Sequence, residues 1–441
     1  MIAPLLVAAA LAVAPDTVRL TLADALRGAL ERYPSVALAR AGREQAAAAV
    51  GEARASLLPR VTLDAQLTQY QEPSIIYPLH GFNPLNPPAF DNSLAQGVAA
   101  VSWTLWDFGG RASRVRAARA AEDAAGAAVE SSEAALVARV TGAYLRVLTL
   151  RGVLDAQDRQ LESLEAEAGR VHQLLSAGRA ARVEVLRIEA EGSRSRADRV
   201  GTAAALDVAE RDLALLAGVP VERARAVALM PLLLRDSSLV PGREAVLERA
   251  RESSPELLQA RRAADAGRAQ AAAVAATRYP ELRLQGNYVD RGTTSGDFRG
   301  EWQAGVGLSY PLFTGGQRTS TIRRAEAESR GRAEQLRQAL FAVEQSVDRA
   351  LATLREARAR VEALAQAAAQ FDEVVRIRQL SLRTGSGTQT DYLEAETQLL
   401  RARASLVEAR HGEIGARVEL ARVTGELTAA WLDRELRQAD R

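Results

Sequence analysis

Apolar residues recur with a period of 3.5 along two long stretches that contain no proline. In the second stretch the spacing alternates between four and three residues, at Leu336, Leu340, Val343, Val347, Ala350, Leu354, Ala357, Val361, Leu364, Ala368, Phe371 and Val375. From Leu136 to Leu175 the first stretch shows the same phase 207 positions earlier, interrupted only at Gln157. A sustained seven-residue repeat is typical of left-handed coiled coils. The pattern predicts helices over 111–176 and 317–383, each on the order of 100 Å long.

Glycine residues follow each of these long stretches, and a second helical stretch comes after them. Gly178 follows the first stretch, and Gly385 and Gly387 follow the second. We therefore expect three hairpin-turn glycines and two returning helices, over roughly 182–217 and 389–424.

Four shorter segments alternate apolar and polar residues with period two, as strands with one apolar face do. They cover about 60–70, 95–105, 281–290 and 301–310. Strands of about 9–11 residues span a bilayer when tilted, and aromatic residues near their ends suit the membrane interface. The expected lipid-facing aromatic residues are Trp103, Tyr288, Trp302 and Tyr310.

Amphipathic hairpins of soluble proteins show the same alternation, so the strands alone leave both interpretations open. Four strands cannot close a barrel that hides its edges from lipid, whereas three copies supply twelve strands. A membrane location of these strands therefore requires a homotrimer.

The chain is an internal duplication. Pro34 and Pro255 lie 221 positions apart, as do Pro59 and Pro280. From Trp103 onward the offset falls to 207, so the first copy carries a local insertion, expected as an external loop over 71–93. We expect a first repeat over 15–218, a linker over 219–242, a second repeat over 243–426 and a tail over 427–441.

The composition agrees with long helices and excludes several function classes. The 57 basic and 55 acidic residues leave a net charge of only +2, which argues against a nucleic-acid surface. The chain has no cysteine, so disulfides and thiolate chemistry are excluded. Residues 1–14 contain a short apolar run ending in Ala12-Val13-Ala14 and are expected to be a signal peptide. A buried N-terminal helix is the alternative.

No enzymatic pattern is present in the sequence. The three histidines, His80, His172 and His411, lack metal-like spacing, and no Walker, GxSxG or HExxH pattern occurs. We expect no catalytic residue, no metal and no cofactor.

The order and spacing of several motifs resemble the TolC-like outer-membrane efflux family. These motifs are LADALRGALERYPSV, ARASLLPRVTL, VSWTLWDFGGR, LSYPLFTGGQR and LRTGSGTQTDYLEAETQLLRARASLVEA. The resemblance implies a mainly α fold with transmembrane β strands, in which duplicated helical hairpins form a trimeric periplasmic tunnel below a 12-strand outer-membrane barrel. It also implies an equatorial collar formed by 219–242 and the tail, with a short strand at Leu232–Leu234.

The resemblance also implies function and partners. The chain would be the outer-membrane exit duct of a tripartite efflux or type I secretion system, in contact with outer-membrane lipid. A periplasmic adaptor would bind at the hairpin-turn glycines, and the inner-membrane pump would be of the RND, ABC or MFS class. A periplasmic adaptor or a soluble coiled-coil scaffold without a pore is the alternative.

Acidic residues narrow the periplasmic end of the tunnel in that family. Asp391 and Glu394 match their positions, and Glu184 corresponds to Asp391 in the first copy. Arg187 stands where Glu394 has its counterpart, so the first copy lacks the second acid. The alternative is that these acids are ordinary first-turn helix carboxylates, which the helix dipole stabilises.

Overall fold

The computed structural model describes residues 18–77, 84–85, 90–220, 227–235, 240–296, 298–384 and 386–438. The expected signal peptide over 1–14, His80 and Gly385 lie outside these residues. Within them, no helix combines the length and the apolar character needed to cross a membrane.

The chain divides into two compact units, and each takes parts of both repeats. Unit 1 comprises residues 1–40, 128–257 and 340–441, and unit 2 comprises 41–127 and 258–339. The long helices contribute residues to both units. The compact units therefore do not coincide with the sequence repeats.

The helices of the two repeats correspond in order and nearly in length. The first copy has α1 (Leu22–Arg32), α2 (Pro34–Ala55), α3 (Gly110–Ser176) and α4 (Arg182–Ala217). The second has α5 (Arg243–Ser253), α6 (Pro255–Ala275), α7 (Gln317–Arg383) and α8 (Gln389–Thr424). Both α3 and α7 have 67 residues, and both α4 and α8 have 36. Pro34 and Pro255 each open a helix, where a missing N–H costs no helical hydrogen bond.

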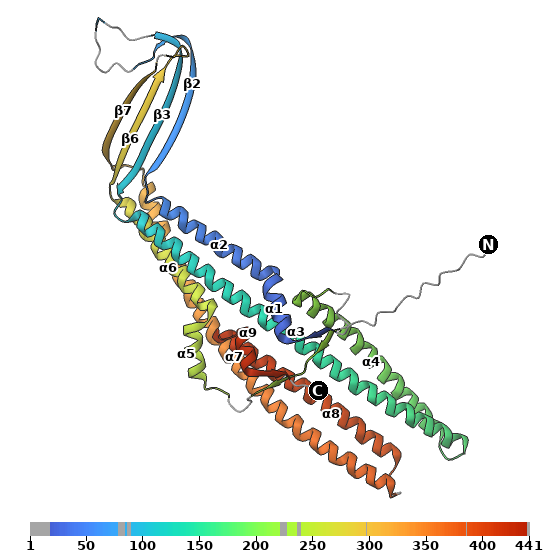
Figure 1. Cartoon of the computed structure of the whole chain (residues 1–441). Helices are drawn as coiled ribbons and strands as arrows, with labels where there is room; N and C mark the ends of the chain where they lie inside the picture. Colours follow the sequence, from blue (N-terminus) through green and yellow to red (C-terminus); the bar gives the residue numbers. More distant parts are fainter. Residues whose placement is uncertain are drawn as a thin grey trace, which may run out of the picture. The chain divides into compact units, whose positions relative to one another are not determined.

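Unit 1 has its core where α3 meets two small sheets (Figure 1). Strand β1 (Val18–Leu20) pairs in parallel with β4 (Val227–Leu229). Strand β5 (Leu232–Leu234), at the expected position, pairs antiparallel with β8 (Leu436–Gln438), which follows the short helix α9 (Ala429–Glu435).

Tyr144 of α3 is fully buried in the core of unit 1 and ties it to the small sheets. Its hydroxyl accepts a hydrogen bond from the Met230 amide at 2.8 Å and lies 3.2 Å from the Leu20 carbonyl oxygen. Burial raises the pKa of Tyr144 to about 12. The phenol therefore stays neutral and keeps its proton for a carbonyl acceptor.

Unit 2 contains one four-stranded antiparallel sheet. Its strands are β2 (Arg60–Ile75), β3 (Phe90–Trp106), β6 (Glu281–Gly292) and β7 (Arg299–Ser309), in the order β2-β3-β6-β7. A single helical turn, η2 (Ala276–Arg278), leads into β6. The first hairpin is longer than expected, so the predicted loop over 71–93 is wrong at both ends. Pairing resumes beyond a register irregularity between Gln69 and Ser74, and this satisfies backbone groups that a loop would leave to solvent.

Candidate functional site

The register of the sheet in unit 2 places its apolar residues on one face. Leu63 pairs with Ala99, Ala99 pairs with Tyr288, and Tyr288 pairs with Trp302. Directly paired residues point to the same face of a sheet, so this row and the alternate rows on either side form one surface. Arg60, Thr62, Gln66, Gln285, Asn287 and Gln303 belong to the opposite face. A slip of one residue at any strand would mix the two faces.

The apolar face of the sheet has no cover within the described residues. Leu63 is 83% exposed and Trp302 is 76% exposed. The other large apolar side chains exposed on this face are Val61, Leu67, Trp103, Tyr288, Val306 and Leu308. A contiguous exposed apolar surface of this kind marks contact with lipid or with another protein.

The two edge strands, β2 and β7, each pair on one side only in the described chain. The four strands therefore form an open sheet, and the expected closure is not a property of one chain. Unpaired backbone N–H and C=O groups along such edges are costly in hydrocarbon. A neighbouring strand is needed wherever this surface meets lipid.

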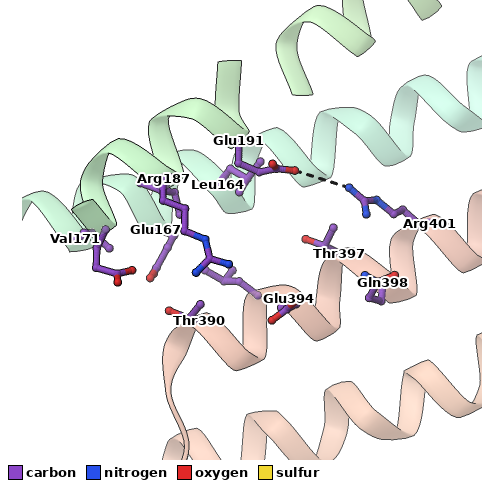
Figure 2. Close-up of a pocket in the computed structure, with 13 residues that line it drawn as sticks. Leu164, Glu167, Val171, Arg187, Glu191, Thr390, Glu394, Thr397, Gln398 and Arg401 are labelled. Atoms are coloured by element: carbon purple, nitrogen blue, oxygen red, sulfur yellow. Dashed lines mark ion pairs between the residues drawn. The ribbon is translucent and has the colours of Figure 1, made fainter. Parts of the chain in front are cut away.

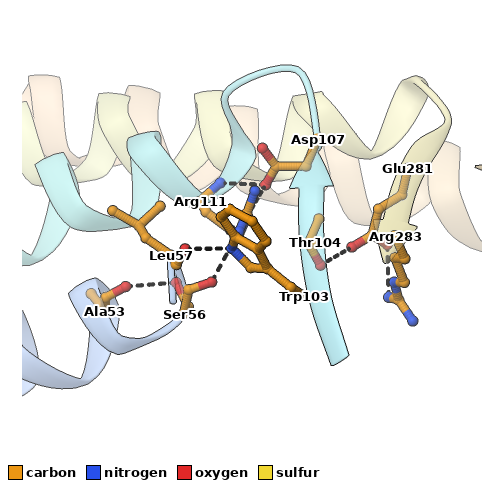
Figure 3. A network of polar contacts seen from close by, with 9 residues as sticks. All are labelled: Ala53, Ser56, Leu57, Trp103, Thr104, Asp107, Arg111, Glu281 and Arg283. Atoms are coloured by element: carbon orange, nitrogen blue, oxygen red, sulfur yellow. Dashed lines mark hydrogen bonds and ion pairs between the residues drawn. The ribbon is translucent and has the colours of Figure 1, made fainter. Parts of the chain in front are cut away.

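A polar network joins the sheet to the helices at the start of α3 (Figure 3). The Trp103 indole donates to the Leu57 carbonyl at 2.8 Å, and Arg111 donates to the Ser56 carbonyl at 3.1 Å. Asp107 accepts from the Arg111 backbone amide at 2.7 Å and forms an ion pair with its guanidinium at 3.3 Å. Asp107 thus accepts a hydrogen bond from a backbone N–H in the first turn of α3 and neutralises the charge of Arg111.

The turn glycines adopt conformations that other residues avoid or lie where a side chain would clash. Gly178 has φ of 70°, in the left-handed region. A Cβ on Gly387 would lie 2.9 Å from the Ser381 Cβ. The Gly387 amide donates to the Ser381 carbonyl at 3.0 Å and so closes the end of α7. Gly385 lies outside the described residues.

Asp391 has a structural role at the beginning of α8. Its amide donates to the Thr388 hydroxyl at 3.1 Å, and its carboxylate accepts from the Thr388 amide at 3.4 Å, which makes a capping box. Arg378 of α7 lies 3.9 Å from the same carboxylate. Asp391 therefore stabilises the first turn of α8. This agrees with the alternative interpretation, in which the acid is an ordinary first-turn helix carboxylate.

Glu184 and Glu394 line one cavity in unit 1, between α3, α4 and α8 (Figure 2). Asp391 is not among its lining residues. Arg187 extends from α4 toward the helix that carries Glu394. In the described part of the chain, the side chains of Glu184, Arg187 and Glu394 have no hydrogen-bond or ion-pair partner.

The same cavity contains charged residues that sequence reasoning did not single out. Glu167 is only 3% exposed and is held by the Arg170 guanidinium. Glu191 of α4 pairs with Arg401 of α8 at 3.8 Å. The sequence offered one signal for this arrangement, because Arg187 aligns with Glu394 between the repeats and both residues line this cavity.

The described histidines lie apart from one another. His172 is 3.0 Å from Glu189 across the first hairpin, and His411 lies 2.7 Å from the Thr149 hydroxyl between α8 and α3. Burial lowers the pKa of His411. Among the described residues, no three His, Cys, Asp or Glu side chains gather closely enough to hold a metal ion.

Comparison with known proteins shows relatives along nearly the whole chain. Outer membrane protein TolC of Vibrio cholerae is 24% identical over 96% of this chain and 95% of its own length. Protein CyaE of Bordetella pertussis is 29% identical over 87% of this chain and 79% of its own length. These relatives match both repeats and the segments between them.

Solved structures show the same fold. The outer membrane protein VceC of Vibrio cholerae superposes with a TM-score of 0.75 at 20% identity, over 92% of this chain and 96% of that one. The MtrE outer membrane channel of Neisseria gonorrhoeae superposes with a TM-score of 0.74 at 21% identity, over 92% of this chain and 88% of that one. The sequence profile of the outer membrane efflux protein family matches residues 25–219 and 246–426. With both repeats matched and the fold shared, the chain belongs to the outer membrane efflux protein family.

Proposed function

We propose that this outer-membrane protein is the protomer of a homotrimeric exit duct in a tripartite efflux or type I secretion system. Three sheets would pool twelve strands into a closed barrel, and three pairs of helical hairpins would form a periplasmic tunnel. An adaptor would bind the hairpin ends near Gly178 and Gly387 and connect the duct to an inner-membrane RND, ABC or MFS pump.

One observation carries this proposal: a sheet with an uncovered apolar face and two unpaired edges. Its other face presents hydrophilic side chains, which a water-filled lumen requires. A periplasmic adaptor or a soluble scaffold would expose this apolar surface to water, which is unfavourable. The family match also favours the duct over both alternatives.

Conductance measures the proposed pore directly. The purified full-length chain, added to a planar lipid bilayer, is expected to produce discrete current steps, and chemical cross-linking is expected to show a trimer. Protein that stays monomeric without detergent and produces no current would refute the duct.

We further propose that carboxylates at the hairpin ends set the ion preference of the narrow end. The Glu184 and Glu394 side chains form no ion pair within the described residues although Arg187 lines the same cavity, whereas Asp391 is engaged in a cap. Three chains would repeat each charge around one axis, and a ring of like charges in a narrow mouth favours counter-ions.

This assignment predicts opposite effects of two substitutions. Glu184→Gln with Glu394→Gln should lower the cation-to-anion permeability ratio roughly threefold or more, because it removes negative charge from the mouth. Arg187→Gln should raise the ratio, and Asp391→Asn should change it less than the double variant. The measurement is the reversal potential under a salt gradient.

A matched control changes two acids of α7 that do not line the cavity. Glu356→Gln with Glu362→Gln removes the same charge and should leave the permeability ratio unchanged. An equal effect of both double variants, or no effect of either, would contradict a role of the cavity acids.

A further inference from the structure

A second cavity lies in unit 2, where β7 ends and α7 begins. Arg278 and Tyr310 line it together with Arg318, Ile322, Arg323 and Glu326. Arg278 forms an ion pair with Glu326 at 3.2 Å. The cavity therefore contains three guanidinium groups and one carboxylate, and the carboxylate is already paired.

The remaining two arginines are not neutralised within the described residues. Arg318 lies 5.0 Å over the Tyr310 ring and donates to the Pro311 carbonyl at 3.2 Å, so it is held in place by neutral groups. Arg323 has no hydrogen-bond or ion-pair partner in the described chain. A positioned guanidinium without a carboxylate is suited to an oxyanion that accepts two hydrogen bonds.

The first repeat shows how the same position is neutralised. Arg111 is the counterpart of Arg318 at the 207 offset, and Asp107 is the counterpart of Thr314. Asp107 pairs with Arg111 at 3.3 Å, whereas Thr314 only accepts from the Arg318 amide at 3.4 Å. The exchange of aspartate for threonine is therefore what leaves Arg318 with an unbalanced charge.

Two apolar side chains with very little cover lie in the segment between Tyr310 and Arg318, both of which line this cavity. Leu312 is 87% exposed and Phe313 is 90% exposed, and both follow Tyr310 at the end of the strand. Exposure of two large apolar residues next to unbalanced cations has a high cost in water. The same combination fits the boundary between acyl chains and headgroups.

We propose that this cavity binds the phosphate of a glycerophospholipid. Arg318 and Arg323 bind the phosphate oxygens, Tyr310 flanks the headgroup, and the acyl chains lie along Leu312 and Phe313. The inference rests on the proposed insertion of the sheet into a bilayer. It assigns specific lipid binding to the second repeat alone, because in the first repeat Asp107 forms an ion pair with the corresponding arginine, Arg111.

The test is native mass spectrometry of the full-length trimer, released from detergent after titration with dioleoylphosphatidylglycerol. The wild type is expected to retain this lipid at concentrations about tenfold lower than Arg318→Gln/Arg323→Gln requires, since two charge-assisted hydrogen bonds are removed. Thr314→Asp copies the first repeat, keeps the helix start capped, and should weaken retention similarly. Dioleoylglycerol, which lacks the phosphate, should not distinguish the variants.

Arg324→Gln/Arg330→Gln is the matched control, because it removes the same charge from α7 outside the cavity. Retention that is unchanged in Thr314→Asp, or equally reduced in the control, would overturn the proposal. If Arg318→Gln/Arg323→Gln lost the trimer but retained lipid as the wild type does, the cavity would be a subunit contact. That result would also overturn the proposal. A wild type that conducts but shows no arginine-dependent lipid refutes this inference alone, whereas a wild type that fails to insert refutes the proposed function.

Discussion

At the residue scale, a few positions leave room for only one amino acid. A Cβ on Gly28 would lie 2.2 Å from the Ala217 carbonyl oxygen, where α1 crosses the end of α4. A Cβ on Gly425 would lie 2.1 Å from the Ser253 carbonyl oxygen, where α5 meets α8. Both contacts pack a short helix against the end of a hairpin, once in each repeat.

Gly425→Ala is expected to destabilise the fold. The residue has φ of 79°, which costs an alanine about 1–2 kcal/mol, and the clash with Ser253 adds to that cost. Gly415→Ala is the control inside α8, the helix that ends just before Gly425, since a Cβ there meets nothing within 4 Å, and it should stabilise by roughly 0.5–1 kcal/mol. Thermal unfolding followed by circular dichroism measures both, and equal midpoints for the two variants would contradict the close approach.

His411 links stability to pH. Burial holds the pKa of His411 below its ordinary value near 6.5, so the unfolded chain binds this proton more readily than the folded chain. Its contribution to stability should be complete above pH 6.5 and should fall as the pH drops below that value. His411→Gln keeps a polar group near Thr149. In this variant the melting temperature should decrease less between pH 7.5 and 5.5 than in the wild type. An unchanged pH dependence would exclude His411 as its source.

At the element scale, the two faces of β2 are expected to differ in what they tolerate. Leu63 belongs to the uncovered apolar face, and Thr62 belongs to the opposite face. The helical elements behave differently, because their partners lie within the same chain and bury Val140, Val147, Val343 and Val347.

Leu63→Arg should therefore impair membrane insertion, by about 2–4 kcal/mol if the residue lies near the bilayer midplane. Thr62→Arg should be tolerated, because the charge would point toward water. The measurement is the yield of trimer in the outer-membrane fraction after expression of each variant. Equal yields would show that the apolar face does not contact lipid.

At the scale of the whole molecule, the proposed duct requires other copies of the chain to complete the open sheet. Edge strand β7 of one chain would pair with edge strand β2 of the next, so that no backbone group faces hydrocarbon unpaired. The strands described in one chain supply the other pairings that the proposed barrel needs, β2 with β3, β3 with β6 and β6 with β7.

Cross-linking can detect that pairing, because the natural sequence contains no cysteine. One cysteine at Ala65 of β2, combined with single cysteines scanned along β7, should produce disulfide-linked dimers and trimers at some positions. Each single-cysteine variant should remain monomeric on a denaturing gel. Absence of linked species across the whole scan would argue against the twelve-strand barrel.

The sequence alone determined the helices, the duplication and the alternation of the strands. The ranges 182–217 and 389–424 agree with α4 and α8, and α3 begins only one residue before its expected start. These features follow from local periodicity and from glycine and proline positions, which act over a few residues. The family resemblance, drawn from motif order and spacing, agrees with the family match.

Only the tertiary structure decided which charges meet. Glu184, Arg187 and Glu394 come together, Asp391 is drawn into a cap, and Arg318 is left without the carboxylate that its counterpart Arg111 has. The extra length of the first hairpin was also decided by pairing across strands rather than by alternation within one. Contacts between residues far apart in sequence depend on register and helix packing, and no local pattern encodes them.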